Sequence, residues 1–278
     1  MGFALLAALT LSACLELQHQ PPPVALIVDD LGYQPRRDHE IAALDAVESF
    51  AILPFTPLAR ELAERLHSAG KEVLLHLPME AVSQNELLGP GALREAMDRP
   101  TFVATVRAAL DALPYLDGVN NHMGSRLTSD AERMDWLMAA LAEARPGLLF
   151  VDSRTTAHSA ARNAARAAAV PYLARDVFLD NRRTAAAINA RLEELVRHAE
   201  LRGDAIGIAH PYPETIAVLR TRLPMPGRIR IVPLETLRAE RECRTRVAAL
   251  RSASVAAAAQ GEQGGADAEP PEQPYAER

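Results

Sequence analysis

The sequence predicts an α/β protein, folded as a distorted (β/α) barrel of seven or eight units. Short apolar runs such as 24–28, 72–75 and 205–209 alternate with segments of helical periodicity. Alternation sustained from 24 to 245 requires parallel strands joined by helices that lie outside the sheet. No glycine-rich phosphate-binding loop follows the first apolar run, so an open nucleotide-binding sheet is less favoured.

The expected elements follow from local patterns. Segment 56–70 carries leucines four residues apart and ends in glycine, which predicts a helix. Segment 129–144 is expected to begin with a capping box formed by Ser129 and Glu132. The remaining helices are expected over 100–113, 157–168, 184–201 and 214–223, and the later strands over 72–76, 118–122, 148–152, 172–178, 205–209 and 229–233.

Composition limits the classes of partner. The chain has 278 residues, of which 49% are hydrophobic, and a net charge of −6. An acidic chain of this kind predicts no nucleic-acid partner. Its two cysteines, Cys14 and Cys243, lie near opposite ends, so we expect neither a disulfide nor a thiolate metal site.

The two ends differ from the body of the chain. Residues 1–23 are expected to be a leader and tether, because the apolar stretch 3–13 has the length of a signal-peptide core. Residues 11–14, Leu-Ser-Ala-Cys, resemble the lipoprotein box, in which the cysteine is lipidated; a plain signal peptide or a short anchor are the alternatives. All three predict export to the bacterial periplasm, with membrane contact only through such an anchor. The Ala/Gly/Glu/Pro-rich segment 246–278 is expected to be disordered, leaving 24–245 as the barrel.

Several of the apolar segments that we expect to be buried strands end in polar residues, which do not contribute to an apolar core. Because parallel strands place their carboxyl ends on one side of the sheet, these residues are expected to converge on one site. They are Asp29, Asp30, His76, His122, Asp152 and His210.

These residue types suit metal-assisted hydrolysis. The adjacent Asp29 and Asp30 cannot both be buried unpaired, and a metal would neutralise one and leave the other as a base. The alternative is a helix cap or an ion pair with Arg36 or Arg37. One carboxylate with two imidazoles matches an open site for a divalent ion, with zinc the first candidate. His210, held between prolines, is a candidate general acid.

Other polar residues near the strand ends are candidates for further ligands or for supporting the ligands. Their alternative role is structural, as ion pairs or turn residues beneath the site. They are Glu80, Asn121, Ser125, Asp152, Arg154 and Asp176.

Five motifs carry a family resemblance: Val28-Asp-Asp-Leu-Gly32, His76-Leu-Pro-Met-Glu80, Asn120-Asn-His-Met-Gly-Ser125, Phe150-Val-Asp-Ser-Arg-Thr-Thr156 and His210-Pro-Tyr-Pro-Glu-Thr215. At these motifs the chain resembles the divergent polysaccharide deacetylases, a branch of the nodulation-type carbohydrate esterases, over about 24–240. The resemblance implies a polysaccharide-deacetylase-like barrel. It also implies metal-dependent removal of N- or O-acetyl groups from a cell-envelope polysaccharide or oligosaccharide.

The resemblance also implies residue roles. Asp29 matches the catalytic base, Asp30 a metal ligand, and His210 the general acid. The wider family supplies two metal-binding histidines from one H-x-x-x-H loop, but here Glu80 stands in the second position. Either Glu80 replaces that histidine or His122 enters from the neighbouring strand, and we favour His122 because it preserves the ligand set. The metal ligands are therefore predicted as Asp30, His76 and His122.

Two further expectations concern the substrate. Tyr33, Tyr172 and Tyr212 are candidates for stacking on sugar rings, with core packing as the alternative for each. The altered second motif leaves open a catalytically impaired envelope protein that binds glycan or a protein partner. A two-metal hydrolase is less favoured, because the chain offers few additional carboxylates.

Overall fold

The computed structural model describes residues 11–263, with side chains described for 12–253. The chain divides into two compact units. One is Pro21–Arg238, and the other combines the residues up to Gln20 with those from Ala239 on.

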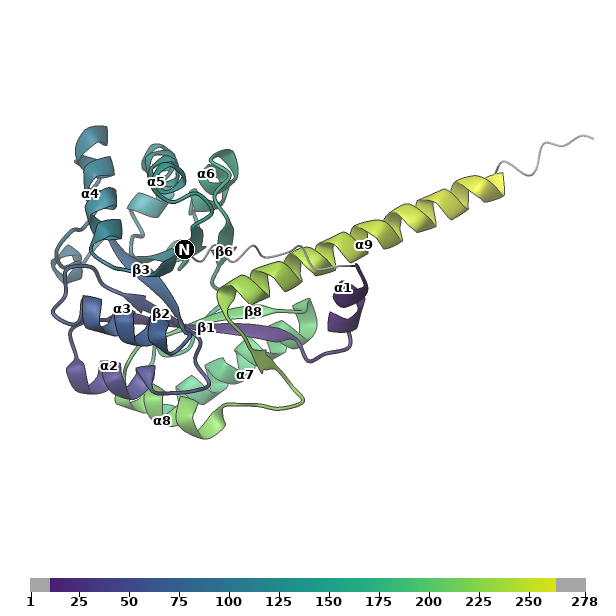
Figure 1. The fold of residues 1–278 in the computed structure, drawn as a ribbon, viewed down its shortest axis with the longest axis horizontal. Coiled ribbons are helices and arrows are strands. Elements are labelled where there is room, and N and C mark those ends of the chain that lie inside the picture. Colours follow the sequence, from purple (N-terminus) through teal and green to yellow (C-terminus); the bar gives the residue numbers. More distant parts are fainter. Residues whose placement is uncertain (1–10, 264–278) are drawn as a thin grey trace, which may run out of the picture. The chain divides into compact units, whose positions relative to one another are not determined.

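The unit Pro21–Arg238 is built on one parallel sheet (Figure 1). Within the described residues its order is β6-β5-β4-β3-β2-β1-β8-β7, and β9 pairs with β1. The strands are β1 Pro23–Leu31, β2 Ser49–Ile52, β3 Glu72–Met79, β4 Leu116–Met123, β5 Leu149–Asp152, β6 Tyr172–Ala174, β7 Val177–Phe178, β8 Ala205–Ala209 and β9 Arg230–Ile231.

The chain itself joins the two edges of this sheet. Strands β6 and β7 end the order on opposite sides, yet only Arg175 and Asp176 separate them in sequence. The Arg175 N–H donates to the carbonyl of Asp152 on β5, and the Asp176 N–H donates to the carbonyl of Ile206 on β8. The sheet therefore curls around on itself, and the predicted distorted (β/α) barrel is confirmed.

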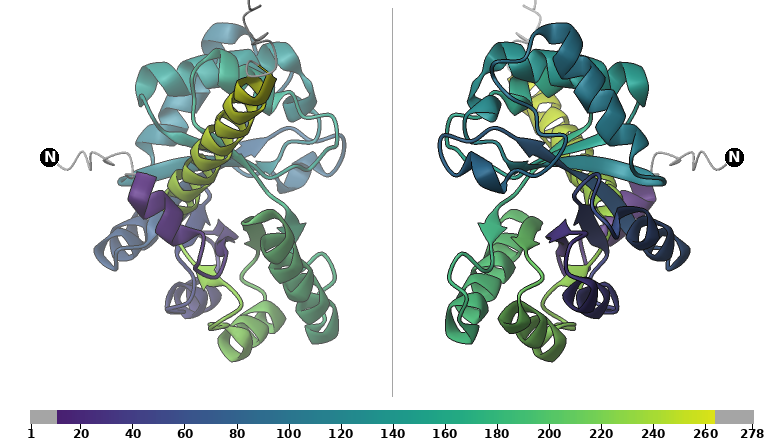
Figure 2. Two further views of the ribbon diagram at one scale, coloured as in Figure 1. Left: turned by 90° about the vertical axis from the view of Figure 1, so that its right-hand side faces the viewer. Right: turned by 90° about the vertical axis from the view of Figure 1, so that its left-hand side faces the viewer.

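Helices cover the outside of the sheet (Figure 2). They are α2 Pro35–Ala42, α3 Ala59–Ser68, α4 Arg99–Asp111, α5 Ala131–Ala144, α6 Ala161–Ala167, α7 Ala185–Arg202 and α8 Pro213–Arg222, with the short 3-10 turns η1 Asn85–Leu87 and η2 Leu127–Ser129. The expected capping box of α5 was wrong. Asp130 caps that helix by accepting the N–H of Arg133, while the Ser129 hydroxyl donates to the carbonyl of Ser125.

The pleat of the strands separates two hydrophobic clusters. On β1, Leu26 and Val28 join the large cluster formed with the helices, whereas Ala25 and Ile27 face the smaller cluster inside the barrel. Leu234 and Leu237, at the start of helix α9 (Leu234–Gln263), complete that inner cluster. Strands packed on both faces are fully apolar until their ends, which is the pattern seen in the sequence.

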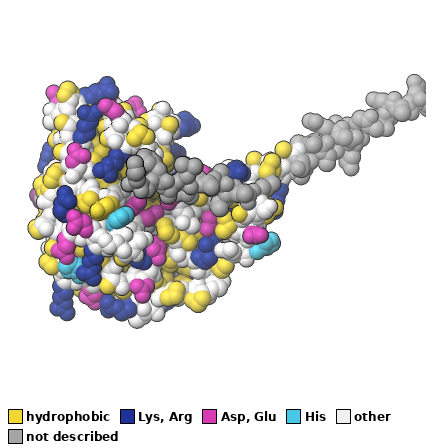
Figure 3. Space-filling model, in the orientation of Figure 1, with side chains coloured by type: hydrophobic (Ala, Val, Ile, Leu, Met, Phe, Trp, Pro, Cys, Tyr) yellow, Lys and Arg dark blue, Asp and Glu magenta, His cyan; other side chains and the backbone are white. Residues whose placement is uncertain are grey.

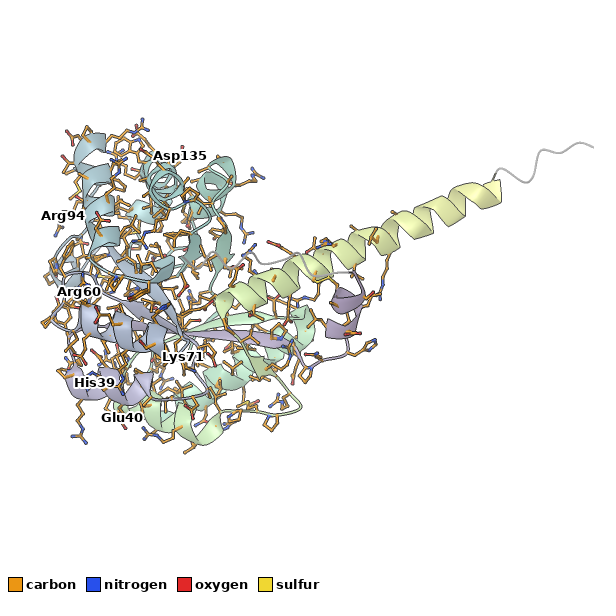
Figure 4. The ribbon with its side chains drawn as sticks, viewed as in Figure 1. His39, Glu40, Arg60, Lys71, Arg94 and Asp135 are labelled. Carbon is orange, nitrogen blue, oxygen red and sulfur yellow. A yellow bond between two sulfur atoms is a disulfide. The ribbon has the colours of Figure 1, made fainter. Side chains whose placement is uncertain are left out.

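Charged side chains of both signs are interspersed on the face drawn in Figure 3. Figure 4 labels His39 and Glu40, both on α2. Each pairs with a neighbouring helix: Glu40 accepts from Arg220 on α8 at 3.0 Å, and His39 contacts Glu61 on α3 at 2.9 Å. Exposed pairs of this kind contribute little to stability.

The unit formed by the chain ends differs from expectation in two ways. Helix α1, Leu11–Leu17, is joined to α9 by a disulfide between Cys14 and Cys243, whose Cα atoms lie 5.3 Å apart. The expectation of unpaired cysteines was therefore wrong, because a separation of 229 residues does not prevent contact in the fold.

Helix α9 also continues to Gln263, although disorder was expected from 246 onward. The alanines of 256–259 favour a helix without apolar periodicity. Residues 264–278 of that expected tail, and 1–10 of the expected leader, lie outside the described residues. None of the helices within 11–263 combines the length and the hydropathy needed to cross a membrane.

Candidate metal centre

An irregularity at the end of β1 turns two successive carboxylates toward one point. Neighbouring residues of a regular strand face opposite sides. The pairing of β1 with β2 shifts register between Val28 and Leu31, and Asp30 adopts a positive φ of 63°. As a result, Asp29 Oδ2 and Asp30 Oδ1 lie 3.7 and 3.1 Å from the same atom, Nε2 of His76.

Asn120 orients both Asp29 and His76. It lies beside His76 in the register of β3 and β4. Its Nδ2 donates to Asp29 Oδ1 at 2.8 Å, and its Oδ1 lies 2.8 Å from His76 Nδ1. Because a carboxylate only accepts, the amide oxygen must face the imidazole, so Nδ1 carries the hydrogen. When His76 is neutral, its Nε2 therefore carries no hydrogen and can bind a cation beside Asp30.

His122 enters from the end of β4. Its Nδ1 lies 2.9 Å from Asp30 Oδ1 and 3.2 Å from His76 Nε2, while its Nε2 lies 3.4 Å from the carbonyl oxygen of Leu87. In the tautomer with its hydrogen on Nε2, His122 donates to that carbonyl and leaves Nδ1 free to bind a cation.

The three donor atoms fit one divalent ion. Asp30 Oδ1, His76 Nε2 and His122 Nδ1 form a group whose atoms lie within 4.8 Å of one another. Donors bound to one zinc ion at the usual bond length lie about 3.0–3.4 Å apart, close to the separations found here. Asp30 Oδ1 is also buried without a hydrogen bond, as expected of an atom that faces a cation.

Burial and neighbouring charges shift the pKa values of the two carboxyls and of His76. Burial opposes ionisation of Asp30, but the imidazoles of His122 and His76 hold its pKa well below the ordinary value. For Asp29 burial prevails and raises the pKa. Burial would lower the pKa of His76, but the charges of Asp29 and Asp30 outweigh it and raise that pKa.

His210, after β8, lies on the other side of Asp30. Its Nε2 is 3.9 Å from Asp30 Oδ2, and its Nδ1 is 2.8 Å from Asp180 Oδ1. Asp180 also accepts the backbone N–H of His210 and the hydroxyl of Thr215. Burial lowers the pKa of His210, but the bond to Asp180 and the nearby carboxylates raise it to about 9.

Sequence reasoning missed both Asp180 and Asn120. Asp180 follows the buried Leu179 at the end of β7, so the rule that identified the other strand-end residues also applies to it. A strand of two residues is too short to recognise from sequence. Asn120 lay within a quoted motif, but its amide gave no sign that it would bridge Asp29 and His76.

The structure places the remaining candidates from the second and third motifs outside the donor group. Glu80 accepts the N–H of Glu95 at 2.8 Å and lies 3.8 Å from Arg126. Asn121 donates to the carbonyl of Met123 and accepts the N–H of Ser153. The Ser125 hydroxyl accepts the N–H of Val82. His122, and not Glu80, therefore lies with Asp30 and His76.

The later candidates have structural contacts. Asp152 accepts the N–H of Arg154 and the hydroxyl of Tyr172. Asp176 accepts the N–H of Ile206 near the amino end of β8, away from the donor group.

The three tyrosines also differ in their surroundings. The hydroxyl of Tyr172 is bound to Asp152, and Arg162 covers its ring. The ring of Tyr212 stacks on His210 at 5.4 Å and its hydroxyl accepts from Arg183. Tyr33 is exposed.

A family model for divergent polysaccharide deacetylases matches residues 26–238. The chain belongs to this family. The match covers nearly all of the barrel, including every residue of the donor group, as the sequence motifs predicted.

Relatives of this deacetylase family member include uncharacterized proteins of two bacteria. YibQ of Escherichia coli K12 is 38% identical over 197 residues, 71% of this chain and 61% of the relative. The chain thus spans less than two thirds of that relative. A protein of Haemophilus influenzae is 36% identical over 215 residues, 77% of this chain and 76% of the relative.

Solved structures share the fold. An uncharacterized protein from Agrobacterium tumefaciens matches with a TM-score of 0.73 and 25% identity, over 78% of this chain and 89% of that one. A lactam utilization protein from Thermus thermophilus matches with a TM-score of 0.54 and 16% identity, over 76% of this chain and 98% of that one. At that identity the second likeness concerns the fold alone.

Proposed function

We propose that this protein is a metal-dependent deacetylase that removes N- or O-acetyl groups from a cell-envelope polysaccharide. The observation that carries the proposal is the donor group of Asp30, His76 and His122, with the buried carboxyl of Asp29 on one side and the imidazole of His210 on the other. Membership of the divergent polysaccharide deacetylase family supports the substrate class.

Asp30, His76 and His122 would hold the ion, with zinc as the first candidate because one carboxylate and two imidazoles suit it. When bound, a divalent ion polarises a carbonyl oxygen and lowers the pKa of a water molecule. Asn120 keeps His76 in the tautomer that can bind a cation.

Asp29 acts as the general base. Asn120 holds its Oδ1, and its Oδ2 faces the donor group. Burial raises the pKa of Asp29 toward neutral pH, and a higher pKa makes the carboxylate a stronger base. Asp29 takes one proton from the attacking water, whose oxygen bonds to the acetyl carbonyl carbon.

His210 acts as the general acid. Its Nδ1–H donates to Asp180, and a pKa raised to about 9 keeps Nε2 protonated at neutral pH. Nε2 gives its proton to the departing amine nitrogen or alcohol oxygen as the bond to the acetyl carbon breaks. The products are acetate and a free amine or hydroxyl group on the sugar.

We further infer that the protein is exported to the periplasm. The disulfide between Cys14 and Cys243 supports this, because such bonds persist in oxidising compartments. Lipidation of Cys14 would use the same sulfur atom, so a lipid anchor and this disulfide exclude one another. Mass spectrometry of Cys14 in membrane and periplasmic fractions distinguishes the two modifications.

The deacetylase proposal is tested by acetate release. Protein stripped of metal and protein reloaded with Zn²⁺ or Co²⁺ are mixed with acetylated chitooligosaccharide, acetylated xylooligosaccharide and peptidoglycan. The reloaded protein is expected to release acetate and the stripped protein to release at least about 100-fold less. Reloaded protein that releases no acetate from any of the three would exclude the proposed activity.

A further inference from the structure

Exposed apolar side chains gather beside the donor group. The large hydrophobic residues that are exposed in the described structure number eight, and four of them lie in the loops that follow β1, β2 and β3. These four are Tyr33, Phe55, Val82 and Leu87. Exposed apolar side chains in neighbouring loops are candidates for a binding surface.

Two glycines of the loop between β3 and α4 lie beside the aromatic rings. A Cβ at Gly91 would lie 2.5 Å from the ring of Phe55, so only glycine lets the ring rest on the loop. A Cβ at Gly89 would lie 3.6 Å from the hydroxyl of Tyr33. Loops from two different strands therefore place their rings on positions only two residues apart, and we call Tyr33 and Phe55 the aromatic rim.

The backbone at Phe55 is strained for an exposed position. Its φ is 59°, which is costly for a bulky side chain, and 47% of the residue remains exposed. Burial of the ring therefore does not account for the conformation. Such strain is compatible with a role in ligand binding but does not by itself assign one, because Tyr115 shares it.

The aromatic rim adjoins the donor group through shared loops. Tyr33 follows Asp30 by three residues, and the exposed Leu87 places its carbonyl 3.4 Å from His122 Nε2. The loop that carries Phe55 is attached to the Tyr33 loop, because the N–H of Leu58 donates to the carbonyl of Gly32.

We propose that Tyr33 and Phe55 bind pyranose rings of the substrate chain next to the sugar whose acetyl group lies at the donor group. The inference rests on the proposed deacetylase function and assigns two residues that bind sugars beyond the one that reacts. A pyranose ring presents an apolar C–H face to an aromatic ring while its hydroxyls stay in water. Tyr172 and Tyr212 already use their hydroxyls and rings within the protein.

Binding to metal-stripped protein tests the aromatic rim without turnover. Affinities for acetylated chitotetraose and acetylated xylotetraose are measured by calorimetry for wild type, Tyr33→Ala and Phe55→Ala. Each substitution is expected to weaken binding of the tetrasaccharide about threefold to tenfold. Gly91→Ala should weaken binding as much as Phe55→Ala, because it displaces the ring, and Phe55→Tyr should retain wild-type affinity.

Tyr115 provides a matched control. It is also exposed, at 51%, with a φ of 60°, but it lies just before β4 at the opposite end of the strands and stacks on His67. Tyr115→Ala should bind as tightly as wild type. Equal affinities for all variants, or no binding of either tetrasaccharide, would overturn the aromatic rim.

Acetate release by the same variants after metal loading separates the two proposals. Binding that depends on the rings, without acetate release by wild type, supports the aromatic rim and contradicts the deacetylase. If wild type, Tyr33→Ala and Phe55→Ala release acetate from the tetrasaccharide at the same rate, the deacetylase is supported and the aromatic rim is contradicted.

Discussion

The two ends of the barrel both carry carboxylates, but the groups that contact them differ. At the amino end, Glu72 accepts the N–H groups of Leu234 and Glu235, and Asp176 accepts the N–H of Ile206. These acids fasten one backbone segment to another. Their oxygens are taken up by these hydrogen bonds.

At the carboxyl end, the carboxylates face imidazoles. Asp30 contacts His76 and His122, and Asp180 holds His210. Burial alone does not separate the two ends, because it raises the pKa of Glu72 as it does that of Asp29. The partners distinguish the two ends: backbone N–H groups, the Ser49 hydroxyl and the Arg202 guanidinium at the amino end, and imidazoles at the carboxyl end.

The largest effect is expected from Asp29→Asn compared with Glu72→Gln. Loss of the base should lower the rate of acetate release about 10²- to 10⁴-fold, since general-base catalysis contributes that much. Glu72→Gln should leave the rate unchanged and lower the free energy of unfolding by about 1–3 kcal/mol. Steady-state acetate assays and urea unfolding of both variants measure this. Similar loss of activity in both would contradict the distinction between the two ends.

Metal content should distinguish His122→Ala from Glu80→Ala. Removal of His122 takes one of three donors and should weaken zinc affinity at least about 100-fold. Glu80 binds the Glu95 N–H, so its removal should leave zinc affinity unchanged. Competition with a chelator measures both affinities. If Glu80→Ala lost the metal and His122→Ala retained it, the donor group would be wrongly assigned.

Two adjacent asparagines sharpen the comparison further. Asn120→Ala frees His76 to change its tautomer and should weaken metal affinity about 10- to 100-fold. Asn121→Ala removes bonds to Met123 and Ser153 and should lower thermal stability while metal affinity persists. Equal metal affinities in the two variants would show that Asn120 only supports the fold.

The smallest effect concerns pH. Burial lowers the pKa of His210, but Asp180 and nearby carboxylates raise it to about 9, so the acid form is present below that pH and is lost as pH rises through it. Asp180→Asn should move the alkaline limb of the rate profile down toward the ordinary value near 6.5. Asp176→Asn should not move it, because Asp176 contacts the Ile206 N–H and Arg202 and not His210. If the alkaline limb of the Asp180→Asn profile stayed in place, the limb would belong to a group other than His210.

Much of the candidate site could be predicted because strand ends are visible in a sequence. Asp29, His76 and His210 each end an apolar run, and parallel strands must bring such ends together. The role of Asp180 was not predictable, since its strand is only two residues long. The disulfide and the length of α9 also escaped prediction, because one depends on a contact across 229 residues and the other on alanine propensity in a segment without periodicity.

The sequence by itself determined the family, the barrel and the side of the sheet on which the polar residues gather, because these depend on local apolar patterns and short motifs. Only the tertiary structure decided that His122 and not Glu80 lies with Asp30 and His76. That choice depends on the bulge at Asp30, on the register of β3 with β4, and on the loop that binds Glu80. These are relations between segments far apart in the chain, and no single segment encodes them.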